Sequence, residues 1–395
     1  MKDLPVEEAR ARMLAGIAAP AGEAVPLEAA VGRVLAEPVL AVRAQPPFAA
    51  SAMDGWAVAG EGERFQIMGE SAAGHGYHRP IEPGQAVRIF TGAPVPPGAT
   101  RVVLQEVAER QDGWVRTPPR GHEPSHIRPA GGDFQAGQSL LEAGVRIDPW
   151  RLSLAAAAGR ASLNVAPRPQ VVVLSTGEEI VPVGTAPKAD QIFNSGGPTL
   201  AALIARWGGE ARHPGAVGDD ADAIAGALET AGGELIVTLG GASVGDHDLV
   251  KPALARLGLE LAVETIRIRP GKPTWFGRLA DGRRVLGLPG NPASALVCAE
   301  LFLRPLLNAL QGGEPGPRLA TALLAAPAPA NGGREHWARA RTAVRDGVIH
   351  ATAFGDQDSS LVSVFAQADA LLRRPVGASA AQIGDVVEIL PLERL

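Results

Sequence analysis

The sequence predicts a multidomain protein in which a central parallel α/β domain is combined with smaller β-rich domains. First, 395 residues are more than one hydrophobic core usually holds, so several folding units are expected. Second, between residues 168 and 310 short apolar runs alternate with helical patterns, which is typical of a parallel sheet covered by helices. Third, 48 glycines and 34 prolines punctuate the chain, which favours β-rich units joined by turns.

The N-terminal part is predicted to form an elongated domain from two segments, residues 1–45 and 141–167. The first segment opens with apolar residues at helical spacing, namely Val6, Ala9, Met13 and Ile17. A second short helix is expected over 27–35. A helical pattern around 150–158 is expected to pack back on these two N-terminal helices.

Residues 46–140 are predicted to form a small β domain inserted between those two segments. Its short apolar runs alternate with turn residues, a pattern typical of strands in an all-β unit. The expected strands cover residues 65–68, 86–90, 101–104 and 114–117.

The α/β domain is predicted over residues 168–310. Its expected strands are 170–174, 235–239 and 284–288, and its expected helices are 198–207, 221–230, 248–257 and 292–310. The last helix has Asn291 at its N-cap position and Pro292 as its first residue, both common choices there. Residues 311–395 are predicted to be a linker followed by a C-terminal β-barrel.

The composition excludes several classes of protein. The formal net charge is −5 and no basic block occurs, so a nucleic-acid partner is not expected. The single cysteine, Cys298, lies in an apolar run and is expected to be a buried hydrophobe, which leaves no disulfide framework or cysteine zinc site. No apolar signal core and no stretch of about 20 apolar residues stands out, so a cytoplasmic protein without a membrane partner is predicted.

Three glycine-containing turns follow the predicted strands of the α/β domain. They carry Ser175, Thr176 and Gly177, then Gly240, Gly241 and Ser243, and finally Pro289, Gly290 and Asn291. Such turns offer backbone N–H groups and positive helix ends to an anion. Ligands of parallel sheets gather beyond the carboxyl ends of the strands, so these turns predict a ligand that bears phosphate.

Carboxylates recur at the same predicted edge, at Glu178, Glu179, Asp219, Asp220, Asp246 and Asp248. Carboxylates beside anion-binding turns favour a phosphate bridged by Mg²⁺, because this cation takes oxygen ligands from both. The alternative is that these side chains only cap the helices that follow. Composition and spacing leave both interpretations open.

Arg267, Arg269 and Lys272 form the main cationic cluster. If the segment before Pro270 is a strand, Arg267 and Arg269 point to the same face. Two guanidinium groups and an ammonium group suit a tetrahedral oxyanion such as phosphate or molybdate. A charged edge strand that prevents aggregation is the alternative.

Common hydrolase motifs do not predict the chemistry of this chain. The His-x-x-x-His spacing occurs at His122 and His126, with Pro124 between them, and the Gly-x-Ser-x-Gly pattern occurs at 241–245, within one of the glycine-containing turns. The sequence has no phosphate-binding Walker loop. In the inserted domain, the polar stretches at 51–55 and 91–94 are, by composition alone, ordinary Asp-Gly and Thr-Gly turns.

Six motifs together resemble one known family. They occupy residues 51–57, 88–96, 174–180, 240–248, 269–273 and 287–295, and they begin with Ser-Ala-Met-Asp-Gly-Trp-Ala and end with Gly-Leu-Pro-Gly-Asn-Pro-Ala-Ser-Ala. In this order they resemble the MoeA family, the molybdopterin molybdenumtransferases, which are related to the E domain of gephyrin. The resemblance covers nearly the whole chain.

The resemblance implies an enzyme that inserts molybdate into adenylylated molybdopterin, releasing AMP and forming the molybdenum cofactor with the help of Mg²⁺. It implies a homodimer whose active site lies at the subunit interface, where the α/β domain of one chain faces the inserted β domain of the other. The resemblance also implies a further partner, the adenylyltransferase that catalyses the preceding step.

The family's functional positions are matched residue by residue. The resemblance implies catalytic roles for Asp54, Thr91, Asp133 and Glu179, and Mg²⁺ or nucleotide ligation by Glu179, Asp219 and Asp248. It implies that Arg339 and Ser359 of the C-terminal domain contribute polar binding groups.

One departure from the family concerns the cationic cluster. Family members usually carry lysine at the positions of Arg269 and Thr265 here, so Arg267 is expected to replace the second charge. Two alternative functions follow from related proteins. One is the molybdopterin adenylyltransferase of the preceding step, and the other is a scaffold or binding protein like gephyrin.

Overall fold

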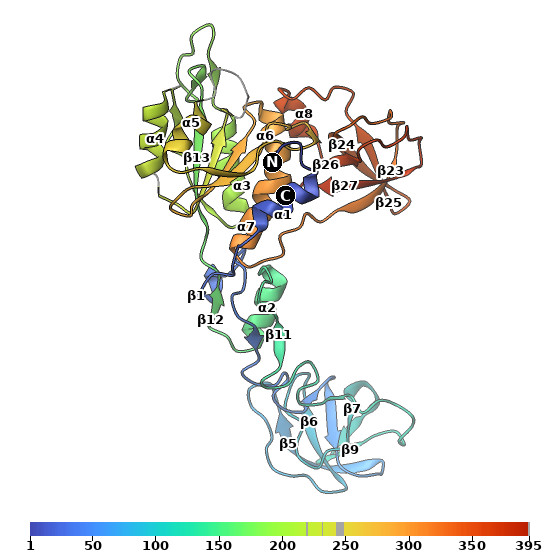
Figure 1. The fold of residues 1–395 in the computed structure, drawn as a ribbon. Coiled ribbons are helices and arrows are strands. Elements are labelled where there is room, and N and C mark those ends of the chain that lie inside the picture. Colours follow the sequence, from blue (N-terminus) through green and yellow to red (C-terminus); the bar gives the residue numbers. More distant parts are fainter. Residues whose placement is uncertain (219, 231, 242–248, 394–395) are drawn as a thin grey trace.

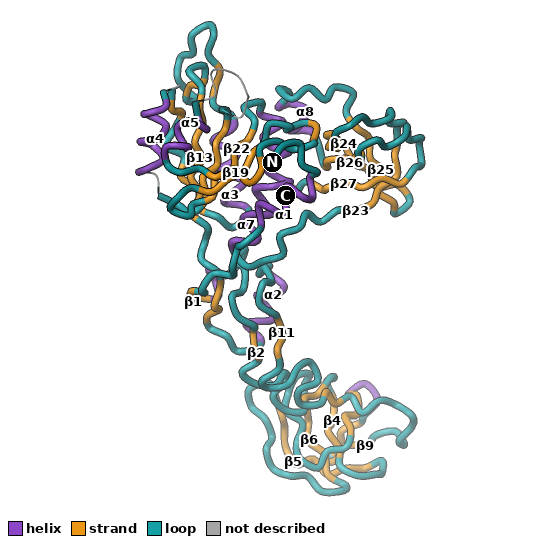
Figure 2. Tube along the Cα trace, in the orientation of Figure 1, coloured by secondary structure: helices purple, strands orange, loops and turns teal. Residues whose placement is uncertain are grey.

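The chain folds into an elongated molecule, with a β domain at one end of a narrow stalk and two larger domains side by side at the other (Figures 1 and 2). The computed structural model describes residues 1–218, 220–230, 232–241 and 249–393. The first helix and the last strand both lie where the two larger domains meet (Figure 1).

The α/β domain is built on a seven-stranded sheet in the order β16-β13-β18-β22-β21-β19, with β17 also paired to β13. These strands are β13 (Gln170–Thr176), β16 (Glu210–Arg212), β17 (Ala216–Val217), β18 (Leu235–Leu239), β19 (Glu260–Val263), β21 (Trp275–Arg278) and β22 (Arg284–Leu288). The central strands are parallel, as the sequence predicts. The β21–β19 edge is antiparallel, contrary to the expected parallel sheet, and the sheet is therefore mixed. A short turn joins β21 to β22, and such a turn connects only antiparallel neighbours.

Helices cover both faces of this sheet. They are α3 (Gly196–Arg206), α4 (Ala221–Thr230) and α5 (Val250–Arg256), together with the helical run from Pro292 to Leu310. Val171 and Val173 of β13 belong to the core beneath α3 and that run, whereas Leu174 belongs to the core beneath α4 and α5. The alternation follows from the two-residue repeat of a strand, so both faces of β13 are buried.

The predicted helix 292–310 is divided into α6 (Pro292–Cys298), a π-helical turn (Ala299–Leu303) and α7 (Arg304–Leu310). Pro305 has no N–H for the carbonyl group one turn earlier, which accounts for the irregular turn before it. By length and composition this run could cross a membrane, although Glu300 and Arg304 interrupt it, so it is not an uninterrupted apolar stretch. However, 78% of its most apolar window is buried inside the protein, as in a core helix.

The N-terminal helix α1 (Val6–Leu14) packs on α7 and β19, and its buried residues join the core of the α/β domain. The stalk consists of paired strands and α2 (Pro149–Ala157), and its strands are β1 (Glu23–Pro26), β2 (Val39–Leu40), β11 (Ser139–Leu141) and β12 (Ser162–Val165). Helix α2 packs with the segment 30–41 rather than on α1 (Figure 1).

The predicted helix 27–35 is wrong except for a 3-10 turn, Leu27–Ala29. The backbone beyond it is engaged elsewhere, because Gly32 N–H donates to the carbonyl of Ile147 (2.8 Å) and Leu35 N–H to that of Val145 (2.9 Å). Backbone groups paired with a distant segment cannot form helical hydrogen bonds.

The inserted β domain has the sheet order β7-β4-β6-β5-β9-β8, and a small pair, β3–β10, lies beside it. Its strands are β3 (Ala50–Ser51), β4 (Gly55–Val58), β5 (Arg64–Ser71), β6 (Gln85–Ile89), β7 (Arg101–Leu104), β8 (Glu109–Gln111), β9 (Trp114–Arg116) and β10 (Ile127–Arg128), with a 3-10 turn at Gln105–Val107. All four predicted strands of this domain are confirmed.

The C-terminal domain is the predicted β-barrel, closed by pairing of β24 with β26. Its strands are β23 (Ala320–Leu324), β24 (Glu335–Arg345), β25 (Val348–Ala353), β26 (Ala370–Arg374) and β27 (Val386–Pro391), accompanied by α8 (Val362–Gln367). The short strand β20 (Ile268–Arg269) leaves the α/β domain and pairs with β24. A separate pair, β14 (Ile180–Val181) and β15 (Ile192–Phe193), projects from the α/β domain.

Candidate functional site

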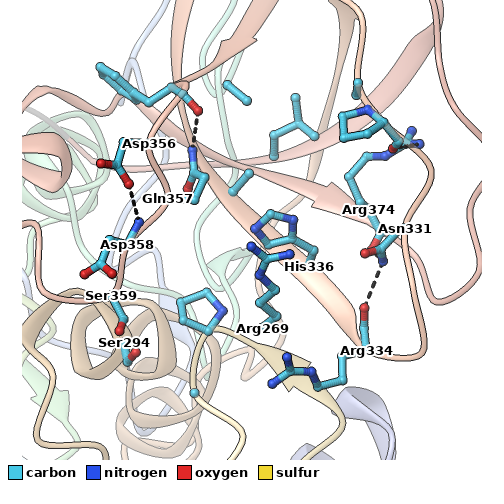
Figure 3. A pocket seen from close by; sticks show the side chains of 18 of the residues that line it. Arg269, Ser294, Asn331, Arg334, His336, Asp356, Gln357, Asp358, Ser359 and Arg374 are labelled. Carbon is cyan, nitrogen blue, oxygen red and sulfur yellow. Dashed lines mark hydrogen bonds between the residues drawn. The ribbon is translucent and has the colours of Figure 1, made fainter.

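A cavity of about 860 Å³ lies between the α/β domain and the barrel, and we call it the interdomain cavity (Figure 3). It gathers predicted binding residues from three segments that are far apart in the sequence. These residues are Arg269, Lys272, Pro289, Asn291 and Ser359. Arg267 is exposed but does not line this cavity, so the structure separates the two arginines that share a strand face.

Strand β20 and the loop after it bring the cationic residues to the cavity. The register pairs Ile268 with Glu335 and Arg269 with His336. Ile268 is fully buried, so its neighbour Arg269 points outward to the cavity side. The loop is then closed by the N–H of Ile266, which donates to the carbonyl of Lys272 over 3.0 Å.

Gly271 is required for the tight turn of this loop. Its φ angle is +104°, and a Cβ atom there would overlap the Sγ atom of Cys298. Cys298 is fully buried, as expected, and burial raises the pKa of its thiol to about 12. The cysteine therefore packs beneath the loop 269–273, which we call the oxyanion loop, and is not a nucleophile.

Asn291 connects the β22–α6 turn to the barrel. It stands at the predicted N-cap position, yet its side chain makes no capping hydrogen bond. Instead its Nδ2 donates to Ser359 Oγ over 2.8 Å, and Ala293 N–H donates to the carbonyl of Ser359 over 3.0 Å. The two residues therefore fix the two sides of the cavity to each other.

Arg339 is fully buried behind the cavity wall. Its Nε donates to Gln357 Oε1 (3.0 Å) and its Nη1 to the carbonyl of Asp358 (2.9 Å), while its buried Nη2 has no partner among the described residues. Burial lowers the pKa of this guanidinium. In this structure Arg339 supports the loop that carries Ser359 and is not among the lining residues.

Thr265 is the other position, besides Arg269, at which family members usually carry lysine. It contacts Asp3, close to the N-terminus. Its Oγ1 accepts from the N–H of Asp3 (2.7 Å) and donates to Asp3 Oδ1 (3.2 Å). The same Asp3 carboxylate lies 3.6 Å from the Nζ of Lys272. Lys272, which lines the cavity, therefore has a counter-ion, Asp3, that does not line it.

Sequence patterns missed the residues on the barrel wall of the cavity, which are Asn331, Arg334, His336 and Arg374. Burial lowers the pKa of His336 to about 4, and the positive charges of nearby arginines, of which Arg269 has the largest effect, act in the same direction. No motif marks these side chains, because only closure of the barrel brings their strands together.

The other predicted turns lie at the carboxyl edge of the sheet. Ser175 accepts from Asn194 Nδ2 (3.0 Å) and Thr176 donates to the carbonyl of Leu239 (3.3 Å), so both buried hydroxyls have structural partners. A Cβ atom on Gly240 would approach Thr176 O within 2.9 Å, which shows how closely the turns of β13 and β18 approach each other. Gly290, after β22, lies beside Gly240.

The predicted Mg²⁺ site cannot be built from the described residues alone. Asp219 and Asp248, like Ser243 and Asp246, lie outside the described residues. Glu179 is exposed next to Gly177 at the sheet edge. Within residues 1–218, 220–230, 232–241 and 249–393, no group of three or more His, Cys, Asp or Glu side chains is placed to hold a metal. Magnesium therefore remains a prediction.

A second polar site occurs on the inserted β domain. Asp54 Oδ1 accepts hydrogen bonds from the N–H (2.7 Å) and Oγ1 (2.8 Å) of Thr91. These bonds, the backbone one first, lower the pKa of Asp54. Composition alone favoured two independent turns, whereas the structure joins them into one feature, which we call the Asp54–Thr91 pair.

Within one chain the Asp54–Thr91 pair and the interdomain cavity lie at opposite ends of the molecule (Figure 1). Asp133 is exposed near the base of the inserted domain, where its N–H donates to the carbonyl of Gln45 (2.9 Å). The structure thus brings the predicted residues together in groups, one on the inserted domain and others on the α/β domain and barrel.

The sequence matches three domain families in order. They are the MoeA N-terminal region (domain I and II) at residues 4–159, a probable molybdopterin binding domain at 172–309 and the MoeA C-terminal region (domain IV) at 321–392. A molybdopterin molybdenumtransferase from Bacillus subtilis is 30% identical over 403 residues, which cover 98% of this chain and 94% of that protein. The chain belongs to the MoeA family.

Further relatives of the MoeA family support this assignment. A molybdopterin molybdenumtransferase from Nostoc sp. is 34% identical over 305 residues, covering 73% of this chain and 70% of the relative. Two solved structures of molybdopterin biosynthesis MoeA proteins from Pyrococcus horikoshii have TM-scores of 0.82 and 0.79 at 30% and 26% identity. The aligned regions cover 100% and 99% of this chain, respectively, and 100% of each solved chain. The resemblance predicted from six motifs is confirmed.

Proposed function

We propose that this MoeA-family chain is a transferase that inserts molybdenum from molybdate into adenylylated molybdopterin, releasing AMP and forming the molybdenum cofactor. The curated relatives named above are molybdopterin molybdenumtransferases, and the chain spans nearly the full length of the one from Bacillus subtilis. The chemistry of the interdomain cavity supports the same activity.

The observation that carries the proposal is the meeting of cationic and hydroxyl groups in the interdomain cavity. Molybdate is a tetrahedral dianion, and Arg269 and Lys272 supply opposite charge on one side. Ser359 and Asn291 supply polar groups already oriented by their mutual hydrogen bond. Groups fixed before binding lose little entropy when the oxyanion arrives. These residues bind and orient the molybdate.

The adenylylated pterin is assigned to the carboxyl edge of the sheet. The turns after β13, β18 and β22 present backbone N–H groups there, which suit phosphate oxygens. Glu179, Asp219 and Asp248 are the proposed ligands of Mg²⁺, which supplies charge neutralisation at a phosphoanhydride when bound. Metal removal with a chelator is expected to abolish AMP release, and added Mg²⁺ to restore it.

A homodimer is part of the proposal. The Asp54–Thr91 pair lies far from the interdomain cavity of its own chain, so a second copy is the natural source of an inserted domain for each α/β domain (Figure 1). Mixing Asp54→Ala and Lys272→Ala chains tests this arrangement. Random pairing of two inactive chains would restore about a quarter of the activity, because half the dimers hold one intact site of two. No recovery after verified exchange of subunits would contradict it.

The central test is molybdate-dependent release of AMP from molybdopterin adenylate by purified Asp54→Ala protein. Release is expected to fall strongly, whereas Glu109→Ala, an exposed acidic residue of the same domain, is expected to retain it. Unchanged release by Asp54→Ala would remove this carboxylate from the mechanism.

The alternatives are less well supported. An adenylyltransferase would consume ATP, whereas this chain is expected to ignore ATP and use the adenylylated product. A gephyrin-like scaffold would bind partners without turnover. The names of the relatives favour the transferase over both. A cytoplasmic location and contact with the adenylyltransferase belong to the same proposal, to be tested by fractionation and by co-purification.

A further inference from the structure

The Asp54–Thr91 pair lies at one end of three neighbouring strands of the inserted domain. Asp54 directly precedes β4, and Thr91 comes two residues after the end of β6. Strand β4 lies between β6 and β7, and its first residue, Gly55, is paired with Ile89 on one side and with Leu104 on the other. The position of the Asp54 carboxylate therefore depends on how these three strand ends are held together.

One guanidinium group connects the three strand ends. Arg88, on β6, donates from Nη1 to the carbonyl of Gly55 (2.9 Å) and from Nη2 to Oε1 of Gln105, which follows β7. The backbone N–H of Gln105 donates in turn to the carbonyl of Asp54 (3.1 Å). Because the donors of a guanidinium lie in one rigid plane, a single side chain fixes Gly55 and Gln105 relative to each other. Asp54 is thereby held through both of these residues.

Two aromatic rings hold the plane of this guanidinium. The Cζ atom of Arg88 lies 4.8 Å from the ring centroid of Phe90 and 5.5 Å from that of Trp56. Both distances are within the range of cation–π interactions. Trp56 is buried, and Phe90 directly precedes Thr91, so the rings are part of the same strand ends. The orientation of the Arg88 fork is therefore fixed on its faces as well as at its edge.

Arg88 holds this region without binding the carboxylate itself. No ion pair of Arg88 occurs in the part of the chain that the structure describes, whereas Arg120 of the same domain pairs with Glu61 (2.5 Å). Among the described residues, Asp54 accepts its side-chain hydrogen bonds through Oδ1 alone, both from Thr91. The other carboxylate oxygen, Oδ2, thus stays available to a reactant.

The charge of Arg88 also acts on this carboxylate. The two hydrogen bonds from Thr91 have the largest effects in lowering the pKa of Asp54, and the positive charge of Arg88 lowers it further. Arg88 therefore has two separable properties, the hydrogen-bonding fork and the charge. Lysine keeps the charge but has no planar fork, so substitution can distinguish them.

We propose that Arg88 is a positioning residue for Asp54, whose fork holds Gly55 and Gln105 so that the carboxylate meets the reactant in one orientation. Arg88 itself does not touch the reacting atoms. The inference rests on the proposed function only for the catalytic role of Asp54, because the fork is a feature of the inserted domain alone.

The first test is steady-state kinetics of molybdate-dependent AMP release by Arg88→Lys protein. We expect kcat to fall about tenfold, because a displaced catalytic group loses its alignment with the reactant. The KM for molybdate is expected to change by less than about twofold, because Arg88 does not line the interdomain cavity where molybdate binds. A normal kcat in Arg88→Lys, with a loss only in Arg88→Gln, would assign the effect to charge and overturn the proposal.

A double-mutant cycle tests whether Arg88 acts through Gln105. Gln105→Ala removes the side-chain acceptor of the fork but keeps the backbone N–H that donates to Asp54. We expect a lower kcat in this variant, and we expect Arg88→Lys/Gln105→Ala to lose no more than Arg88→Lys alone. Losses that add in the double variant would show that the two residues act independently, contrary to the proposal.

Hydrogen exchange gives a readout that does not depend on activity. In Arg88→Lys the amides of Thr91 and Gln105 are expected to exchange about tenfold faster, with the amide of Val87 inside β6 unchanged. Arg64→Gln is the matched control, because Arg64 also lies over an aromatic ring, that of Trp114 (4.4 Å), but on exposed β5. It is expected to change neither exchange nor kcat.

The remaining outcomes are also decisive. Unchanged exchange at Thr91 and Gln105 in Arg88→Lys would overturn the proposal. If exchange rises throughout the inserted domain, Gln105→Ala decides the same question, because it leaves Arg88 and its aromatic contacts in place. Failure of the proposed function has a different signature. In that case the unmodified protein releases no AMP, while exchange at Thr91 and Gln105 still depends on Arg88.

Discussion

The Asp54–Thr91 pair and the interdomain cavity hold charged groups in contrasting ways. In the inserted domain a single carboxylate is satisfied locally, by the N–H and hydroxyl of one threonine. In the cavity, cationic side chains from three distant segments meet, and most lack acidic partners in the described structure. The first site is complete within one small domain, whereas the second depends on how two domains pack. This difference predicts which substitutions remain local and which affect the whole site.

The largest effect is expected for Gly271→Ala. The new methyl group would overlap Cys298 at a φ angle of +104°, so we expect a loss of about 3–5 kcal/mol in unfolding free energy, measured by urea denaturation. Gly282→Ala is the matched control, because Gly282 has φ +89° with open space around it, and about 1–2 kcal/mol is expected. Equal losses would show that the oxyanion loop is not tightly packed on Cys298.

The next effect concerns the support behind the cavity. Arg339→Met removes the Nη1 donor of the Asp358 carbonyl and leaves Gln357 Oε1 with only the backbone N–H of residue 339, at a cost of about 2 kcal/mol in stability. Molybdate affinity is also expected to fall about tenfold, because the loop that carries Ser359 loses its anchor. Arg345→Met, exposed on the same strand, is expected to change stability by less than about 0.5 kcal/mol. Normal molybdate affinity in Arg339→Met protein would show that the loop holds itself.

For the Asp54–Thr91 pair we predict a change confined to the pKa of Asp54. Thr91→Val removes the side-chain hydrogen bond that helps to lower the pKa of Asp54, so the carboxylate pKa should rise toward its ordinary value in NMR titrations. Because the folded-state pKa is lowered, the contribution of Asp54 to stability is present above its ordinary pKa and is lost as the pH falls through the folded value. A pKa unchanged by Thr91→Val would mean that the backbone N–H alone sets it.

The smallest effect is expected at the counter-ion of Lys272. Asp3 competes with an incoming oxyanion for Lys272, but both side chains are largely exposed. Asp3→Asn should therefore strengthen molybdate binding only about two- to fivefold at low salt, and less at high salt. Glu8→Gln, which removes a charge from α1 without facing Lys272, is the control. Weaker binding by Asp3→Asn would show that Asp3 orients the lysine rather than competing for it.

Local patterns predicted much of the fold. Apolar runs located β13, β18 and β22, because a strand buried on both faces must be apolar at nearly every position. They failed at 27–35, where backbone groups pair with residues 144–147, and at the antiparallel edge of the sheet, where β21 and β19 carry no pattern that distinguishes their direction. Pairing with a distant segment leaves no signal in a short window.

The sequence by itself determined the family, the order of the domains and the residues of the Gly-rich turns and of the oxyanion loop, because each is set by neighbouring residues along the chain. Only the tertiary structure decided that Arg339 supports the wall from behind, that Asn291 bonds Ser359 instead of capping α6, and that Arg334 and Arg374 share a cavity. Barrel closure and domain packing place these side chains, and both depend on contacts between residues far apart in the chain.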